Sequence, residues 1–261
     1  MSSSMDPRPP LDPHRLPHTV EIVEEAGSTN ALLAARAREG AEAGLVIVAE
    51  HQTSGRGRLD RSWEVPPRAA LTFSVLVRPE VEPASWPWLP LLAGYAVHAA
   101  LDDRADGIGL KWPNDIVVET VDGPLKLAGI LVERVDTPTG PAAVLGVGIN
   151  VHQTPAELPI EAATSLEQLV EGVPDRTEVL GTVLASLETL LPLIEDTDAL
   201  RRAYAGECVT IGKTVRVDVP AGEPLTGTAV DIDAGGRLVV DTGAGEVPVG
   251  AGDVIHVRAA E

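Results

Sequence analysis

The sequence predicts an α+β domain followed by a small β-barrel. Up to Cys208, strand-like and helix-like segments are interleaved, which is typical of an α+β domain. After Cys208, short β-rich segments alternate with Gly and Asp turns, which indicates a barrel. The 261 residues and the hydrophobic content of 44% are enough to bury a core. We therefore divide the chain into a Pro-rich leader that we expect to be disordered (1–18), a larger domain (19–208) and the barrel (209–261).

Hydrophobic periodicity and turn residues predict the elements of both parts in order. The predicted strands of the larger domain are 19–24, 44–50, 71–79, 110–119, 126–135 and 142–151. The predicted helices are 31–40, 86–103, 174–196 and 197–208. The predicted barrel strands are 213–219, 225–233, 236–242, 245–250 and 253–259. The first helix follows three capping residues, Ser28 to Asn30, and Asp175 caps the third.

The acidic balance of the chain argues against a general nucleic-acid binder. It has 20 Lys plus Arg against 39 Asp plus Glu, a net charge of −19, whereas phosphate neutralisation needs a broad basic face. A single cysteine excludes an intramolecular disulfide and fits a reducing compartment. There is no apolar run of about 18 residues and no signal-peptide core. We therefore expect a cytoplasmic protein that binds neither DNA nor membranes.

Positive charge, scarce elsewhere, gathers in HQTSGRGRLDRSW (51–63). Arg56, Arg58 and Arg61 fall within six positions, and two glycines relax the backbone between them. Arginine offers a planar fork of donors for phosphate and carboxylate oxygens. The segment is either an anion-binding loop or a solvated patch, and the scarcity of positive charge elsewhere favours the loop.

Three further blocks carry residues that suit chemistry but also have ordinary structural explanations. KWPND (111–115) holds an amide and a carboxylate that also fit a turn. KLAGILVE (126–133) opens with Lys126, whose ammonium is either a point charge at a reaction centre or a group that reaches the surface. Gly129 in the same strand indicates either a bulge or a close approach of a ligand. GVGIN (146–150) is a weak signal on its own.

Other chemistries find no support in the sequence. The six histidines show no metal-ligand spacing, and no dinucleotide fingerprint, Walker loop or G-x-S-x-G elbow is present. Cys208 lacks a flanking base or cation, which favours a small buried hydrophobe over a nucleophile.

Taken in order, five motifs resemble the biotin protein ligase family. They are STN (28–30), QTSGRGR…RSW (52–63), KWPND (111–115), KLAGILVE (126–133) and GVGIN (146–150). The resemblance runs from about Val20 to the C-terminus, where the last stretch is similar to the family's SH3-like barrel. It implies a mixed β-sheet backed by helices, of the class II synthetase-like biotinyl/lipoyl transferase type, in a monofunctional enzyme.

The resemblance implies an ATP-dependent, AMP-forming ligase. Such an enzyme activates biotin with ATP to biotinyl-5′-AMP and transfers biotin to one lysine of a biotin carboxyl carrier domain of a biotin-dependent carboxylase. The implied ligands are biotin, ATP and Mg²⁺, and we expect a monomer or a weak homodimer.

The resemblance also implies roles for individual residues, carried over by position. The implied catalytic residues are Lys126, Arg56 and Arg58. The implied biotin-binding residues are Ser28, Thr29, Asn30, Gln52, Arg56, Gly57, Arg58, Lys126, Gly129, Leu131 and Gly146. The implied nucleotide-binding residues are Arg58, Arg61, Trp63, Asn114, Asp115, Lys126 and Asn150. Mg²⁺ is expected mainly on the ATP phosphates, with Asp115 as the candidate protein ligand.

The sequence departs from the family pattern at two places. Leu59–Asp60 stands where many relatives have a basic or small residue followed by glycine, which predicts less complete loop closure. Segment 116–125 looks longer than in short-loop relatives, which puts the role of Asp115 in doubt first. About twenty residues precede the first strand, so we expect no winged helix and no operator binding.

Two other functions stay open at this point. A lipoate or octanoate ligase or transferase would share the fold, but the arginine loop and the terminal barrel favour biotin, and the transferases depend on a cysteine. A non-catalytic biotin-binding protein would keep the pocket, but it gains little from phosphate-directed cations such as Arg56 and Lys126.

Overall fold

The structure is a computed structural model that divides into two compact units. It describes residues 8–16, 19–172, 174–218, 223–250 and 252–256. The first unit comprises 1–79 and 126–185, and the second comprises 80–125 and 186–261.

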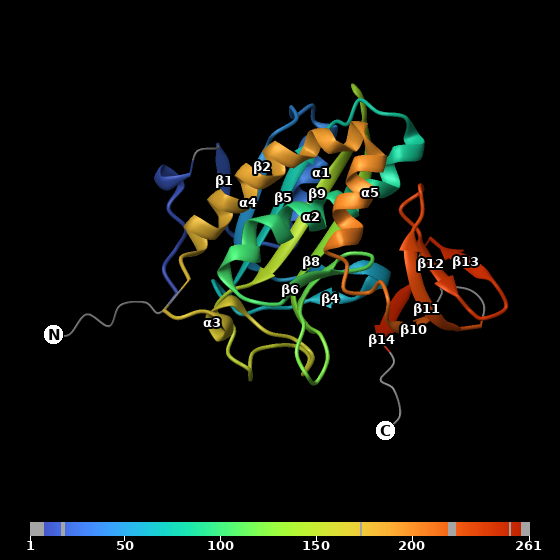
Figure 1. Cartoon of the computed structure of the whole chain (residues 1–261). Coiled ribbons are helices and arrows are strands. Elements are labelled where there is room, and N and C mark those ends of the chain that lie inside the picture. The colour runs from blue at the N-terminus through green and yellow to red at the C-terminus, as the bar shows by residue number, and fades with distance from the viewer. Residues whose placement is uncertain (1–7, 17–18, 173, 219–222, 251, 257–261) are drawn as a thin grey trace. The chain divides into compact units, whose positions relative to one another are not determined.

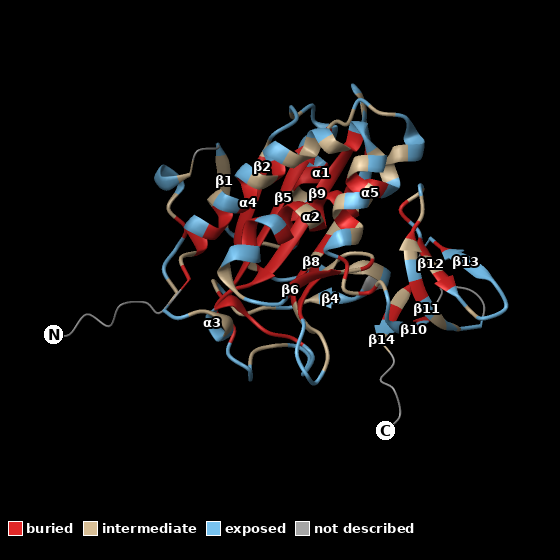
Figure 2. Cartoon of the chain, viewed as in Figure 1, coloured by how far each residue is buried: buried red, intermediate tan, exposed pale blue. Residues whose placement is uncertain are grey.

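The first unit is built on a mixed sheet, as predicted. Its strands are β1 (Val20–Ala26), β2 (Val46–Gln52), β5 (Ala70–Val77), β9 (Gly140–Asn150) and β8 (Leu125–Thr137), which follow one another in this order across the sheet. The pair β1–β2 is parallel, and the other pairs are antiparallel. Figure 1 shows these strands side by side, and Figure 2 shows that β2, β5 and β9 are largely buried. The five predicted strands are confirmed to within a few residues.

Helix α1 (Thr29–Arg38) packs on this sheet, and the predicted cap is present. The Ser28 hydroxyl accepts a hydrogen bond from the Ala31 N–H. One core cluster joins Leu33, Ala34 and Ala37 of the helix to Ile47, Leu76, Val135, Ala142 and Val144 of the sheet. Since the apolar face of α1 is buried against the middle of the sheet, the N-terminal turn of the helix is fixed next to the strands.

Residues 8–16 contradict the prediction of a disordered leader. The Leu11 side chain is buried, and its N–H donates to Glu50 (2.7 Å). Glu50 in turn forms a buried ion pair with Arg176 at 2.6 Å. The high proline content of this segment predicted disorder. It could not indicate the partners that order the segment, because those partners are distant in sequence. The rest of the predicted leader lies outside the described residues.

Helix α4 (Arg176–Leu190) begins where the sequence predicts. The Asp175 carboxylate accepts hydrogen bonds from the N–H groups of Thr177 (2.8 Å) and Glu178 (3.3 Å). With the 3-10 turn that follows, the helical segment Arg176–Glu195 is long and apolar enough, by length and composition alone, to cross a membrane. The sequence predicts no such segment, because charged and polar residues interrupt its apolar stretches. One such helix is weak evidence for a span, because core helices of soluble proteins meet the same criterion.

The second unit contains helices, a hairpin and the predicted five-stranded barrel. Its helices are α2 (Leu89–Leu101) and α5 (Thr197–Gly206), and its hairpin strands are β6 (Ile108–Lys111) and β7 (Asp115–Val118). The barrel strands are β10 (Thr214–Asp218), β11 (Leu225–Ile232), β12 (Leu238–Asp241), β13 (Glu246–Val249) and β14 (Asp253–His256), all paired antiparallel in the order β13-β12-β11-β10-β14. The single strand predicted at 110–119 is wrong, because a turn at 112–114 breaks it into the β6–β7 hairpin.

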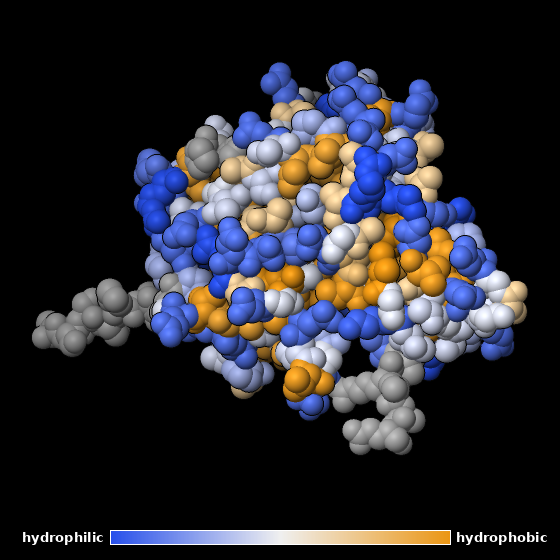
Figure 3. Space-filling model, viewed as in Figure 1, coloured by the Kyte–Doolittle hydropathy of each residue, from blue (hydrophilic) through white to orange (hydrophobic). Residues whose placement is uncertain are grey.

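Several short helical elements lie between the longer helices and strands. They are α3 (Leu166–Leu169) and the 3-10 turns η1 (Pro13–Arg15), η2 (Arg58–Asp60), η3 (Pro83–Trp88), η4 (Asp102–Arg104) and η5 (Leu191–Glu195). Figure 3 shows hydrophilic side chains over much of the visible surface, as the high charge of the sequence predicts.

Two tryptophans bind the barrel to the rest of the second unit. Trp88 and Trp112 are buried, and their indole N–H groups donate to the carbonyls of Ala234 (2.9 Å) and Gly236 (3.0 Å). The predicted boundary at Cys208 therefore marks a change of composition along the chain and does not coincide with a boundary between the compact units.

Candidate functional site

The N-terminal turn of α1 forms a fixed polar corner with two strands. At the end of β2, Gln52 Oε1 accepts hydrogen bonds from the N–H (2.7 Å) and the hydroxyl (3.1 Å) of Thr29. On β5, the Ser74 hydroxyl is directed toward Thr29 Oγ1 (2.8 Å) and Asn30 Oδ1 (2.6 Å). All four side chains are buried, so the corner that the STN motif predicts is held by strands as well as by the helix.

Asn30 extends this corner to β8. Its Nδ2 donates to the Leu131 carbonyl (3.1 Å) and to Glu133 Oε2 (2.7 Å). Gly146 leaves the necessary space, because a Cβ at that position would lie 2.2 Å from Asn30 Oδ1. The resemblance assigns Leu131 to biotin, and the carbonyl of this residue already accepts a hydrogen bond from the protein.

The segment that the sequence predicts to be an anion-binding loop forms a short hairpin. Strand β3 (Gly55–Arg56) pairs with β4 (Ser62–Trp63). Leu59, at the tip, has φ 54°, in the left-handed region that side chains other than glycine rarely adopt. Arg56 reaches toward β8, where its NH2 group lies 3.2 Å from Glu133 Oε1. Glu133 is therefore the point at which the hairpin meets the polar corner.

Trp63 connects the hairpin with Lys126. The Lys126 ammonium lies 5.7 Å from the centroid of the Trp63 ring, within the range of a cation–π contact. The ring covers two glycines of the sheet: a Cβ would lie 2.7 Å from it at Gly148 and 3.4 Å at Gly129. Trp63 Nε1 is buried and finds no hydrogen-bond partner among the described residues. A ligand acceptor at this place would satisfy that donor.

The backbone of Lys126 is held by the chain that follows β9. Its N–H donates to the Ala162 carbonyl (2.9 Å), and its carbonyl accepts from the Thr164 N–H (2.9 Å). Asn150 Nδ2 contacts the Lys126 carbonyl (3.3 Å) and the Thr164 carbonyl (2.9 Å). Asn150 thus holds the Lys126 backbone in place, a role that the sequence did not predict for this residue. The origin of the lysine side chain is fixed by these contacts.

The structure brings most of the predicted biotin residues together in the first unit, but not every predicted site residue. Arg58 and Arg61 lie on the hairpin, and their contact with phosphate stays a prediction. Asn114 and Asp115 belong to the second unit, so their place in the site also stays a prediction. Within the described part of the chain, no group of three or more His, Cys, Asp and Glu side chains could hold a metal ion.

Sequence reasoning missed three residues of this arrangement. Ser74 is a polar residue within the apolar strand LTFSVLV, and that contrast was the available signal. Glu133 ends a motif that was otherwise interpreted as a buried strand. Gly148 lies two positions after Gly146 on the same strand, so both glycines face the same side of the sheet.

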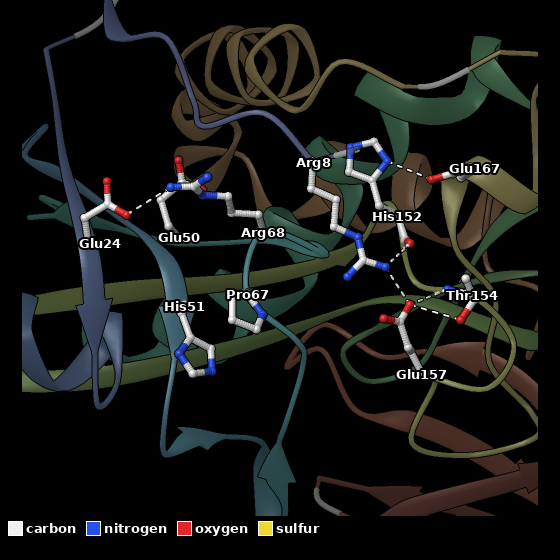
Figure 4. A pocket seen from close by; sticks show the side chains of 10 residues that line it. All are labelled: Arg8, Glu24, Glu50, His51, Pro67, Arg68, His152, Thr154, Glu157 and Glu167. Atoms are coloured by element: carbon white, nitrogen blue, oxygen red, sulfur yellow. Dashed lines mark hydrogen bonds and ion pairs between the residues drawn. The ribbon is translucent and has the colours of Figure 1, made fainter. Parts of the chain in front are cut away.

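A hollow of about 660 Å³ lies near the ends of β2 and β9. None of its lining residues is a predicted site residue. Figure 4 shows that its charged groups face one another in pairs. The pairs are Arg8 with Glu157 (2.6 Å), Arg68 with Glu24 (3.3 Å) and His152 with Glu167 (2.9 Å). Because these groups are committed to one another, the hollow fits a structural role for residues 8–16.

Burial and hydrogen bonding shift the pKa values of groups in this hollow. Burial lowers the pKa of His152 below its usual value, although Glu167 opposes the shift. Hydrogen bonds from Arg8 and Thr154 lower the pKa of Glu157 to about 2. His152 is therefore neutral and Glu157 ionised near pH 7, which keeps the Arg8–Glu157 pair intact.

The cysteine has no sign of reactivity. Cys208 is 6% exposed, and burial raises the pKa of its thiol. Since the thiolate is the nucleophilic form, this position is inert, as the sequence analysis expected.

Comparison with known proteins gives consistent results. A model of the biotin/lipoate A/B protein ligase family matches residues 24–150, and a model of the biotin protein ligase C-terminal domain matches residues 210–257. The biotin–[acetyl-CoA-carboxylase] ligase of Mycobacterium tuberculosis is 42% identical over 96% of this chain and 97% of its own length. The bifunctional ligase/repressor BirA of Bacillus subtilis is 30% identical over 84% of this chain and 68% of its own length.

Solved structures agree with these sequence matches. The biotin protein ligase of Aquifex aeolicus, in complex with biotin and ATP, has a TM-score of 0.76 and 27% identity, and the match covers 92% of this chain and 99% of that one.

Proposed function

The chain belongs to the biotin protein ligase family, and from this premise we propose that it attaches biotin to a carboxyl carrier domain in two steps. First, biotin and ATP give biotinyl-5′-AMP and pyrophosphate. Then the biotinyl group passes to one lysine of the carrier, and AMP leaves. The observation that carries the proposal is the hydrogen-bond network that runs across the sheet through Gln52, Thr29, Ser74, Asn30, Glu133 and Arg56. The lipoate alternative is not favoured, because the relatives compared are biotin ligases.

The polar corner is the proposed seat of the biotin head. Its side chains are buried and already hydrogen-bonded within the protein, so a ligand meets them in fixed positions. Such preorganisation lowers the entropy cost of binding. Gly129 and Gly148, which leave room on the sheet beneath Trp63, are the proposed floor.

The first step brings two anions together, the biotin carboxylate and the α-phosphate of ATP, and nearby cations are needed to reduce their repulsion. A biotin carboxylate oxygen attacks the α-phosphorus while pyrophosphate leaves. Two like charges about 4 Å apart repel by about 4 kcal/mol at an effective dielectric near 20. Arg56, Arg58 and Lys126 are assigned to offset this repulsion and to stabilise the charge on the phosphorus oxygens. Mg²⁺ on the ATP phosphates supplies further positive charge.

The second step needs no nucleophile from the enzyme. The carrier lysine attacks the carbonyl carbon of the adenylate, and the bond to the AMP oxygen breaks. The inert setting of Cys208 supports this direct transfer. Between the steps, the arginine hairpin covers the adenylate against water.

The partner and the domain division complete the proposal. The carrier is that of an acetyl-CoA carboxylase, as the name of the Mycobacterium tuberculosis relative suggests. Residues 19–208 are the catalytic domain and 209–261 the SH3-like barrel, a division supported by the family match at 210–257. We place the protein in the cytoplasm as a monomer or weak dimer, and its net charge of −19 argues against binding to operator DNA.

Pyrophosphate exchange tests the proposed activity. The protein is mixed with biotin, Mg·ATP and radiolabelled pyrophosphate, and label is expected to enter ATP only when biotin is present. Replacing biotin with lipoate or octanoate is the specificity control and is expected to give no exchange. Biotin binding without exchange would identify a non-catalytic binder and refute the ligase proposal.

A further inference from the structure

We propose that Glu133 is a positioning residue that sets Arg56 relative to the polar corner and thereby governs how firmly the site retains its adenylate. The inference rests on the proposed function, since it concerns the same site. Its residues, Glu133, Asn30 and Arg56, all lie in the first unit.

Glu133 is held on one side by a buried group. Asn30 Nδ2 donates to its Oε2 at 2.7 Å, and Asn30 is itself fixed by the Leu131 carbonyl and by Ser74. A hydrogen bond to a charged acceptor is stronger than a neutral one. The carboxylate therefore has a defined position before Arg56 approaches it.

On its other side Glu133 meets a movable cation. The Arg56 side chain is 50% exposed, and its NH2 group lies 3.2 and 3.4 Å from the two oxygens of Glu133. Only this one terminal nitrogen contacts Glu133, whereas a guanidinium carries five N–H donors. Glu133 can thus orient the guanidinium while other donors turn to a ligand carboxylate or phosphate.

Glu133 differs from the acidic partner of an ordinary surface ion pair, because it contacts two parts of the site. Arg36 and Glu21 form a comparable pair at 2.9 Å with similar exposure, but among the described residues Glu21 forms no side-chain hydrogen bond with the polar corner or the arginine hairpin. Glu133 instead bridges the corner proposed to hold biotin and the hairpin proposed to hold its activated carboxyl group. The two parts are linked through one carboxylate, so Glu133 is expected to couple them.

Glu133→Gln separates these contacts. The amide oxygen of glutamine can still accept from Asn30, but the charge that orients Arg56 is removed. We expect the KM for biotin in pyrophosphate exchange to rise about two- to fivefold, with little change in kcat, because the pair is partly exposed. Gel filtration measures the release of labelled biotinyl-AMP from the enzyme, and we expect this release to accelerate by a similar factor. Glu21→Gln is the matched control and should change neither quantity.

A double variant distinguishes a positioning role from a general structural one. If Glu133 acts through Arg56, adding Glu133→Gln to Arg56→Gln should change adenylate release no further. Effects that multiply in the double variant would overturn the proposal, as would an unchanged release rate in Glu133→Gln. Thermal melting checks that each variant is folded. If Glu133→Gln fails to fold, Glu133→Asp replaces it. The aspartate side chain keeps the charge but is one methylene shorter, and we expect the same faster release of the adenylate.

The failure of this inference is distinct from the failure of the proposed function. If the wild-type protein forms no biotinyl-AMP, the ligase proposal falls and takes this inference with it. If the wild type forms the adenylate and Glu133→Gln retains it equally well, only the role of Glu133 is refuted.

Discussion

The polar corner and the arginine hairpin are predicted parts of one site, yet they are held by different means. At the corner, Thr29, Asn30 and Ser74 are at most 4% exposed and are joined by short hydrogen bonds. In the hairpin, Arg56 is half exposed and rests on an ion pair with Glu133. The sheet thus fixes the polar corner, which would recognise a neutral head group. The arginine hairpin, which would meet an anion, is held more weakly and can move.

The magnitudes support this division. Leaving a buried hydrogen-bonding group without its partner costs about 1–3 kcal/mol. A partly exposed ion pair contributes roughly 0.2–1 kcal/mol. The hairpin can therefore open at a small cost, whereas the corner cannot rearrange without a large loss.

Lys126→Ala gives the largest expected effect, because the Lys126 ammonium is assigned to the reacting carboxylate and phosphate and lies beside the hairpin. Its backbone is fixed by Thr164 and Asn150, while its ammonium lies over Trp63 of the hairpin. We expect adenylate formation to fall by about 10²–10³-fold, the range for one lost electrostatic contact to a transition state. Biotin binding, measured by calorimetry, should change only modestly. Lys213→Ala is the control, and unchanged turnover in Lys126→Ala would refute the catalytic role.

Gly146→Ala tests the rigidity of the corner. The new Cβ would lie 2.2 Å from Asn30 Oδ1, so Asn30 must leave its hydrogen bonds. We expect a loss of stability of about 1–3 kcal/mol and a rise of at least about tenfold in the biotin KM. Urea unfolding and exchange kinetics measure the two effects. Gly206→Ala, where a Cβ meets nothing, is the control. A normal KM in Gly146→Ala would mean that the corner is not rigid.

Arg56→Ala tests the movable region. The fold should persist, because Arg56 is half exposed, but one charged contact to the adenylate is lost. We expect free biotinyl-AMP to leave the enzyme about tenfold faster, which corresponds to about 1.4 kcal/mol. Chromatography of the supernatant measures this release, and Arg36→Ala is the surface control. Equal retention in Arg56→Ala and wild type would show that the hairpin does not hold the intermediate.

Leu59→Gly gives the smallest expected effect. Glycine relieves the left-handed backbone at φ 54°, but it also increases the freedom of the unfolded chain, so the net change in stability is within about 1 kcal/mol. Easier closure of the hairpin should slow adenylate release by less than about threefold. Leu59→Ala keeps the unfavourable φ and serves as the control. Faster release in Leu59→Gly would mean that the tip needs its stiffness.

The sequence predicted the motif residues of the site better than the residues that hold them in place. Ser28, Thr29, Asn30 and Gln52 are neighbours in the structure, as the resemblance implied. Ser74 and Glu133 were not predicted, because a single polar residue in a strand does not indicate what faces it. The turn at 112–114 was predicted to lie inside one strand, since the alternation of its neighbours concealed the break.

By itself, the sequence determined the element types, the capped helix starts, the barrel strands and the family, because periodicity, caps and motifs act over a few neighbouring residues. Only the tertiary structure decided that Ser74 completes the polar corner, that Glu133 joins the corner to the hairpin, that Trp63 covers Gly148, and that Arg8 reaches His152. These contacts join residues far apart in the chain, with separations of 44 for Ser74 to Asn30 and 144 for Arg8 to His152. No local pattern specifies such partners, since each is chosen by the packing of whole strands and helices.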